Sequence, residues 1–167
     1  NENFDVVTMI NGSAGGFLQT NNGIIEKYCY DNSTSNFDTY GGLYEWPEAM
    51  QYATTAGVAG ICPTNWHIPT YNEFQTLITA TGNNSNSLKA VGQGTGNNSS
   101  GFSALLGGYR YNDGGFGGYL GGNAYFWSST EWGNDFAYSL ELRGNGSQVS
   151  LISYHKPYGF SIRCLKD

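Results

Sequence analysis

The stretch that decides the fold is FWSSTEWGNDFAYSLELRGNGSQVSLISYHKPYGFSIRCLKD, residues 126–167. Its framework of apolar positions consists of Ala137, Leu140, Leu142, Val149 and Leu151. Leu140 and Leu142, and later Val149 and Leu151, stand two positions apart, which is typical of half-buried strands and not of a helix. Turn signals at 133–134 and 144–146 separate the runs, so we predict three or four strands joined by tight turns.

Between the apolar positions stand aromatic and short polar residues of the kinds that make contacts in binding proteins. We expect the strands to present them to solvent as one ligand-binding face. The set is Trp132, Asn134, Phe136, Tyr138, Glu141, Arg143, Asn145, Ser153, Tyr154, His155 and Tyr158. Affinity would come from burial of aromatic rings, with Arg143 and His155 adding direction.

The composition indicates one loop-rich domain that contains β-strands. A chain of 167 residues is most simply a single domain with a substantial core. Charged residues make up 12%, aromatic residues make up 16%, and there are 25 glycines, which favours strands and loops over helices. The net charge of −6 argues against binding to nucleic-acid backbones, and no apolar run approaches the roughly 20 residues that span a bilayer.

Two helices are expected in the first half of the chain. One covers about residues 44–55, where large apolar residues recur at helical spacing. The other begins at Thr70, because Thr70 and Glu73 have the spacing of a capping box. An apolar stripe at i, i+3 and i+4 follows from Phe74 and ends near Gly82.

The remaining segments are interpreted as short strands, turns and loops. Residues 6–10 and 23–25 predict two or three short strands, with a hairpin as one arrangement. Residues 29–42 consist of turn-forming types, and residues 82–101 have the composition of a surface loop. Residues 107–123 combine glycines with aromatic rings, which predicts short strands with tight reversals and rings that mostly fill the core.

Six motifs occur along the chain in a defined order. They are GIIEKYCY at 23–30, YGGLYEW at 40–46, GICPTNWHIPT at 60–70, GGYR at 107–110, FWSST at 126–130 and GFSIRC at 159–164. In content and order they resemble the Fibrobacter succinogenes major paralogous domain, over about residues 22–167. The resemblance implies a single α+β domain of C-type-lectin-like fold, with two helices packed on twisted antiparallel sheets. Residues 1–21 would belong to this domain or form an N-terminal extension.

The same resemblance implies a function and a location. Family members include variable proteins of diversity-generating retroelements, so residues 126–164 are a candidate variable region that binds a protein or cell-surface ligand. Mutagenesis at adenines of an AAC codon cannot produce Trp, Glu, Lys or Gln. Glu131, Trp132, Glu141 and Gln148 would therefore be fixed or differently derived. The expected location is the extracellular space or the surface of Bacteroidetes-type bacteria, as a lipoprotein or secreted protein, or a phage particle.

The chain has three cysteines, Cys29, Cys62 and Cys164, so at most one disulfide forms within it. The resemblance implies a bond between Cys62 and Cys164, and two buried thiols are the alternative. Phe37 stands where the family has a second cysteine, so Cys29 is expected to be free. A bond that closes a loop of about a hundred residues would stabilise the fold by several kcal/mol.

The sequence gives little support to catalysis. No serine lies in a GxSxG elbow, and His67, between Trp66 and Ile68, is interpreted as a structural hydrogen-bonding residue. The chemistry of the formylglycine-generating fold, to which the family is distantly similar, needs redox-active or copper-binding cysteines near the C-terminus, where Cys164 stands alone. We expect no enzyme, no catalytic residue and no resident cofactor or metal, and no nucleic acid or membrane as partner.

A carbohydrate-binding lectin is the main alternative, and a purely structural surface module is a weaker one. Lectin-like folds often bind calcium through Asp, Glu and Asn oxygens. Residues 132–135 (WGND) are similar to the Trp-Asn-Asp of calcium lectins with one residue inserted, but the companion Glu-Pro-Asn type tripeptide is absent. Calcium dependence, the identity of the ligand and the oligomeric state stay open.

Overall fold

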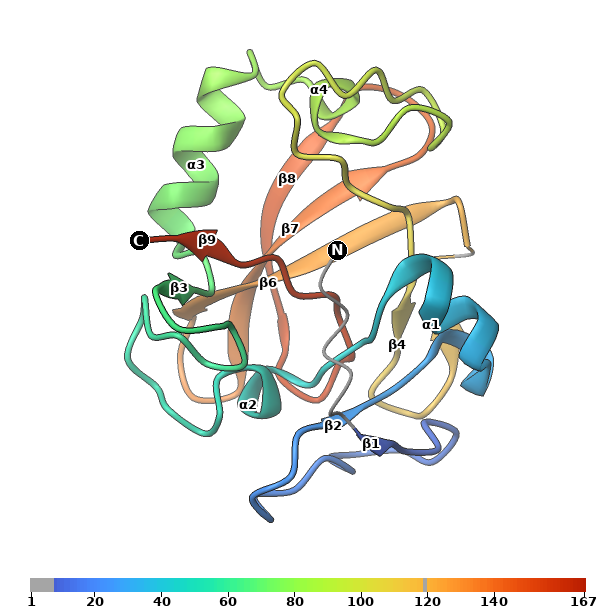
Figure 1. Ribbon diagram of the computed structural model, residues 1–167, viewed down its shortest axis with the longest axis vertical. Helices are drawn as coiled ribbons and strands as arrows, with labels where there is room; N and C mark the ends of the chain where they lie inside the picture. Colours follow the sequence, from blue (N-terminus) through green and yellow to red (C-terminus); the bar gives the residue numbers. More distant parts are fainter. Residues whose placement is uncertain (1–7, 119) are drawn as a thin grey trace.

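A three-stranded antiparallel sheet is the largest element of the computed structural model, which describes residues 8–118 and 120–167 (Figure 1). Its strands are β6 (Asn123–Glu131), β7 (Phe136–Arg143) and β8 (Val149–His155), in the order β6-β7-β8. The predicted turns join these strands. The sheet predicted from alternating apolar residues is therefore confirmed.

Both faces of this sheet are covered by other parts of the chain. On one face, called here the helix face, Phe126, Leu140 and Leu142 pack with Phe74 and Ile78 of helix α3 (Tyr71–Ala80). On the opposite face lies a second apolar cluster. It contains Tyr44, Trp46, Tyr125, Trp127, Ala137 and Phe160. A strand with two covered faces offers few side chains to solvent.

Helix α3 begins as the sequence predicts. The Thr70 hydroxyl accepts the backbone N–H of Glu73 at 3.3 Å, and the Glu73 carboxylate accepts the backbone N–H of Thr70 at 2.8 Å. This reciprocal capping box satisfies two of the donors that a helix start leaves free.

The helix expected at 44–55 is much shorter, because α2 spans only Trp46–Ala49. Gln51 and Tyr52 have positive φ angles of 50° and 61°, which right-handed helical backbone cannot contain. The Trp46 side chain nevertheless lies in the core, where its Nε1–H donates to the Ser128 carbonyl at 2.8 Å.

The interpretation of residues 29–42 as turns is wrong. A short 3-10 turn, η1 (Tyr30–Asn32), is followed by helix α1 (Thr34–Tyr40). No residue of α1 is buried, so the helix has no apolar stripe that a sequence pattern could reveal. The segment predicted as a surface loop at 82–101 also holds one helical turn, α4 (Ser85–Leu88).

Short strand pairs complete a mixed α and β fold with few helices and several small sheets. β1 (Thr8–Met9) runs parallel to β2 (Glu26–Lys27), so a hairpin is wrong here, since parallel strands need a longer crossover. The part of the predicted strand before residue 8 lies outside the described residues. The reversals predicted in 107–123 include β4 (Tyr109–Arg110), antiparallel to β5 (Phe116–Gly117).

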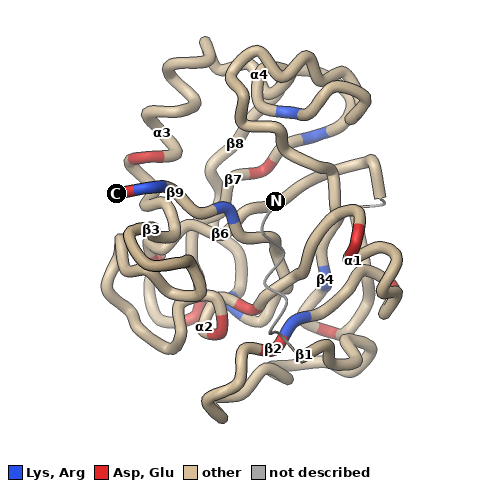
Figure 2. Tube along the Cα trace, in the orientation of Figure 1, with Lys and Arg blue, Asp and Glu red and all other residues tan. Residues whose placement is uncertain are grey.

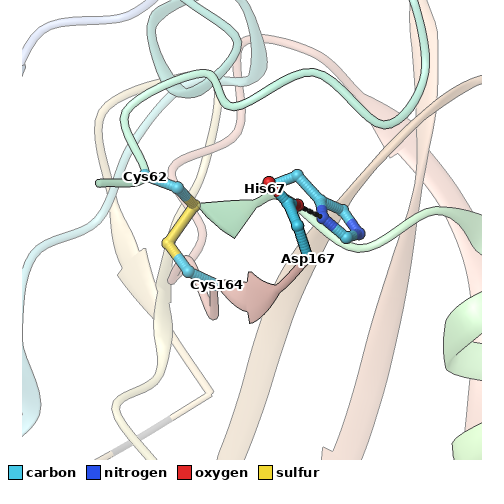
Figure 3. The surroundings of a disulfide bond; sticks show 4 residues. All are labelled: Cys62, His67, Cys164 and Asp167. Atoms are coloured by element: carbon cyan, nitrogen blue, oxygen red, sulfur yellow. Dashed lines mark hydrogen bonds and ion pairs between the residues drawn. A yellow bond between two sulfur atoms is a disulfide. The ribbon is translucent and has the colours of Figure 1, made fainter. Parts of the chain in front are cut away.

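The chain's C-terminal segment returns to its middle. β9 (Leu165–Lys166) pairs antiparallel with β3 (Trp66–His67). Beside this pair, Cys62 and Cys164 form a disulfide with an S–S distance of 2.01 Å (Figure 3). The disulfide implied by the family resemblance is thus present, and Cys29 is a free, buried thiol as expected. Within the described residues, no helix has the length and apolar character to cross a membrane.

Candidate ligand-binding surface

The eleven residues expected to form one face are distributed over both sides and both ends of the β6–β8 sheet. Alternate residues of a strand point to opposite faces. Phe136, Tyr138, Ser153 and His155 belong to the helix face, whereas Glu141, Arg143 and Tyr154 belong to the opposite face. The expectation of a single face is therefore wrong. It fails because polar and aromatic residues of the predicted set lie on both faces of the sheet, outside the clusters of buried apolar residues on each face.

The first group forms an aromatic patch, defined here as Tyr71, Trp132, Phe136, Tyr138 and His155. The ring centroids of Trp132 and Phe136 lie 5.7 Å apart, and those of Phe136 and His155 lie 4.1 Å apart. Tyr138 lies 4.6 Å from Tyr71, the first residue of α3. Trp132 is 54% exposed and His155 is exposed, so the patch presents aromatic surface to solvent.

A pocket of about 390 Å³ adjoins the aromatic patch. Asn134 and His155 of the predicted set lie on its wall, together with the carboxylates of Glu131 and Asp135. Other lining residues come from segments that are distant in sequence and were not predicted as part of a site. These include Phe17, Trp46, Pro47 and Tyr52. No local pattern could have identified them, because only the fold brings them to the β6–β7 turn.

Lys156 lines this pocket and holds the β6–β7 turn beside it. Its ammonium group donates to the carboxylate of Glu131 and to the Asn134 carbonyl, the latter at 2.7 Å. The same group lies 4.6 Å from the centre of the Trp46 ring. Lys156 is buried, and these contacts engage its charge in holding the turn in place.

The second group surrounds Glu141, which is only 4% exposed. The Arg143 Nε–H donates to its carboxylate at 2.9 Å, and the hydroxyl groups of Tyr154 and Tyr125 lie at 3.3 Å and 3.5 Å. The prediction of Glu141 as an exposed contact residue is wrong, because these side chains cover it. Burial, and then the charge of Glu141, raises the pKa of Tyr154.

Tyr158 joins the same group through ring contacts. Its centroid lies 5.8 Å from Tyr154 and 5.9 Å from Tyr111. Tyr109 adds a further edge contact to Tyr111 at 4.6 Å. These rings form a tyrosine cluster on the side of the sheet away from the aromatic patch. The sequence predicts that the rings of the glycine-rich segment mostly fill the core, but Tyr109 is only half-buried and Tyr111 is exposed.

Asn145 lies apart from both groups, in the exposed β7–β8 turn at the other end of the strands. The buried Lys89 holds this turn. Its ammonium group donates to the carbonyls of Arg143 at 2.7 Å and of Gly146 at 2.9 Å. Asn145 and Asn134 therefore mark opposite ends of the sheet and cannot contact one small ligand together.

The imidazole of His67 makes the structural hydrogen bonds that the sequence predicts. Its Nδ1 lies 2.6 Å from the Asp167 carboxylate, and its Nε2 lies 3.0 Å from that of Glu73 (Figure 3 shows the Asp167 contact). The bond to Asp167 contributes most to a raised pKa of His67. Because both nitrogens are occupied, neither is free to act as a general base.

Charged side chains outside these contacts are sparse. Lys and Arg residues are scattered singly over the trace, without a continuous basic stripe in the part of the chain that the structure describes (Figure 2). In that same part, no three His, Cys, Asp or Glu residues gather closely enough to hold a metal ion. Among these residues, therefore, no cluster of three such side chains is available to form a calcium site.

Comparison with known proteins identifies the chain at the level of its family. No curated protein and no solved structure matches it. The family model described as the Fibrobacter succinogenes major domain matches residues 1–166. Since this match spans almost the whole sequence, the chain belongs to the Fibrobacter succinogenes major domain family.

Proposed function

We propose that this chain is a non-catalytic ligand-binding module of receptor or adhesin type. Its ligand, a protein or another component of a cell surface, binds at the aromatic patch and the adjoining pocket. The observation that carries this proposal is the exposure of Trp132 above Phe136, in contact with a half-buried ring rather than inside the core. Exposed aromatic rings over a fixed base are the anchors that dominate binding energy at interfaces.

Several features support the finer parts of this proposal. Family membership supports a C-type-lectin-like fold, and a disulfide is compatible with an extracellular or cell-surface location, on a bacterium or a phage particle. The occupied nitrogens of His67 support a role without catalysis.

Diversification by a retroelement is part of the same proposal. Asn134, Arg143, Asn145 and His155 are exposed, whereas Leu140 is fully buried, so the outer positions could change without altering the core. Glu141, a residue type that adenine mutagenesis of an AAC codon does not produce, is buried, which fits a fixed position. Sequencing the neighbouring DNA tests this point. The proposal requires a reverse transcriptase gene and a near-copy of the segment coding for 126–164 that differs at adenines.

A lectin is the second candidate function, favoured by the exposed β6–β7 turn, which carries Trp132, Asn134 and Asp135 within four residues. An indole face beside amide and carboxylate groups suits a sugar ring. A glycan array probed with and without calcium separates the two candidates. Glycan binding that depends on calcium would favour the lectin over a protein receptor.

The site itself is tested with a ligand recovered from panels of glycans and of bacterial surface proteins. We expect replacement of both Trp132 and His155 by Ala to weaken its binding about thirtyfold or more, because exposed aromatic anchors carry hot-spot energies. Ile152→Ala is the matched control, since Ile152 is an exposed apolar residue on the opposite face of the same sheet. Unchanged affinity in the double variant would show that the site lies elsewhere.

A further inference from the structure

A second concave surface lies away from the aromatic patch, between α3, β9 and the loop at 100–102. It is a groove of about 740 Å³ next to the disulfide. Figure 1 shows β3 and β9 beside α3, and residues of these three elements are part of the lining of the groove. Its lining is mainly apolar and includes Trp66, Leu77, Phe102 and Leu165. Trp66 is 38% exposed and Leu165 is 41% exposed, so two large apolar side chains there remain open to solvent.

One cation, Arg163, lines the same groove. Its guanidinium donates one hydrogen bond to the Phe102 carbonyl and lies 4.9 Å from the centre of the Phe102 ring. Within residues 8–118 and 120–167, no carboxylate forms an ion pair with it. A guanidinium has five N–H donors, and the Phe102 carbonyl uses only one of them.

The other arginines of the fold differ from Arg163 in this respect. Arg110 lies 3.7 Å from the carboxylate of Glu45, and Arg143 lies 2.9 Å from that of Glu141. Partial burial without a counter-charge disfavours the cation, and burial accordingly lowers the pKa of Arg163. An anion placed in the groove would relieve this cost and could use the planar donor pair of the guanidinium.

Glu73 also lines the groove, but its carboxylate is already engaged. It accepts hydrogen bonds from the backbone N–H and hydroxyl of Thr70, both at 2.8 Å, and contacts His67 at 3.0 Å. Burial opposes the charged carboxylate, yet these hydrogen bonds dominate and the pKa of Glu73 is lowered. The carboxylate therefore stays directed at the helix cap and leaves Arg163 as the charged group open to a ligand.

We propose that this groove binds a small amphipathic carboxylic acid. The apolar body lies against Trp66, Leu77 and Leu165, and the carboxylate pairs with the guanidinium of Arg163. The groove volume lies within the range of small-molecule sites. This site is separate from the aromatic patch, so the inference stands whether or not the proposed receptor function holds.

Calorimetric titration of the full chain with sodium octanoate, 1-octanol and octylamine tests the chemistry. We expect octanoate to bind about tenfold more tightly than 1-octanol, since only the acid offers a charged partner to Arg163, and octylamine to bind least. The fluorescence of Trp66 should change with octanoate, and Trp66→Phe should remove that change. Equal binding of 1-octanol and octanoate would overturn the proposal. A second result would also overturn it, namely that octanoate does not bind while an apolar hexapeptide containing one Glu does bind.

Two variants locate the site. Arg163→Gln should weaken octanoate binding about tenfold and leave 1-octanol binding unchanged. Leu165→Glu keeps Arg163 and places a carboxylate at the exposed rim of the groove, so it should also weaken octanoate binding about tenfold. This second variant decides the matter if Arg163→Gln fails to fold. Val91→Glu adds the same charge at a residue that is 76% exposed and does not line the groove, and should have no effect. Octanoate binding unchanged by Leu165→Glu in a folded protein would overturn the proposal.

Discussion

The β6–β8 sheet and the rest of the described chain are held together in different ways. In the sheet, backbone pairing runs along strands of seven to nine residues. Before it, the strands are only two residues long, and side chains supply much of the cohesion. The buried Arg110, for example, donates to the Gly12 carbonyl at 2.8 Å and to the Pro157 carbonyl at 3.1 Å.

This difference teaches where substitutions can be tolerated. A polar side chain in the irregular part is used by the fold, because it satisfies backbone groups that no strand partner reaches. In the sheet most backbone groups pair with those of a neighbouring strand, and the exposed side chains of the β6–β7 turn are available for a ligand. Changes in the first region should therefore alter stability, and changes at the aromatic patch should alter binding.

The largest expected loss of stability comes from removing the disulfide. Cys62 and Cys164 are separated by 102 residues, and a loop of that length corresponds to about 4–5 kcal/mol in the chain-entropy model. Replacing both cysteines by Ala should lower the free energy of unfolding by about that amount, as measured by denaturant titration. A reductant should lower the stability of the natural chain and leave the variant unchanged. If the variant loses less than about 1 kcal/mol, the irregular region does not depend on this cross-link.

Arg110→Met should cost about 3–5 kcal/mol, because it leaves the buried Glu45 without its cation and frees several carbonyls. Denaturant titration measures this change too. Lys166→Met is the control. Lys166 is exposed, so its replacement should stay within about 0.5 kcal/mol. Equal effects of the two substitutions would contradict the view that buried side chains hold this region together.

The same contrast explains which helices and strands could be predicted from the sequence. The α3 helix and the three strands were predictable, because a capping box and alternating apolar residues are local signals. The pairing of β1 with β2 was not, since two-residue strands carry no period and their parallel partner is set by tertiary contacts. Helix α1 was missed because it buries none of its residues.

The candidate site was predicted only in part, for a related reason. Alternation indicates that Glu141 and Tyr138 lie on different faces, but it does not say what covers each face. Tyr125 and Tyr154 cover Glu141, and only the fold brings Phe17 and Tyr52 to the pocket beside His155.

A smaller effect concerns pH. Burial outweighs several hydrogen bonds and raises the pKa of Glu45 to about 7, from an ordinary value of 4.5. The folded chain therefore holds a proton between these pH values that the unfolded chain releases. Stability from this group is fully present below pH 4.5 and is lost as the pH rises through about 7.

Glu45→Gln should flatten this part of the pH profile, with a difference on the order of 2 kcal/mol between pH 4.5 and 7. The measurement is the free energy of unfolding at several pH values. The slope of the free energy of unfolding against pH is the quantity to compare. A Gln amide that fits the site poorly would lower stability equally at every pH and would not by itself alter this slope. Parallel profiles for the two proteins would show that Glu45 does not titrate in this range. Asp38→Asn, at an exposed carboxylate, serves as the control.

The smallest change in stability is expected for Trp132→Ala. Trp132 follows the last residue of β6 and more than half of its surface faces solvent, so the free energy of unfolding should change by about 0.5 kcal/mol or less. Trp127→Ala, at a fully buried tryptophan of the same sheet, should cost about 3–5 kcal/mol by the same denaturant titration. A tryptophan that contributes little to folding and stays exposed over Phe136 would be available to the ligand proposed above. A large stability loss in Trp132→Ala would instead make it a structural cap over Phe136, and would remove the main support for a binding site at this turn.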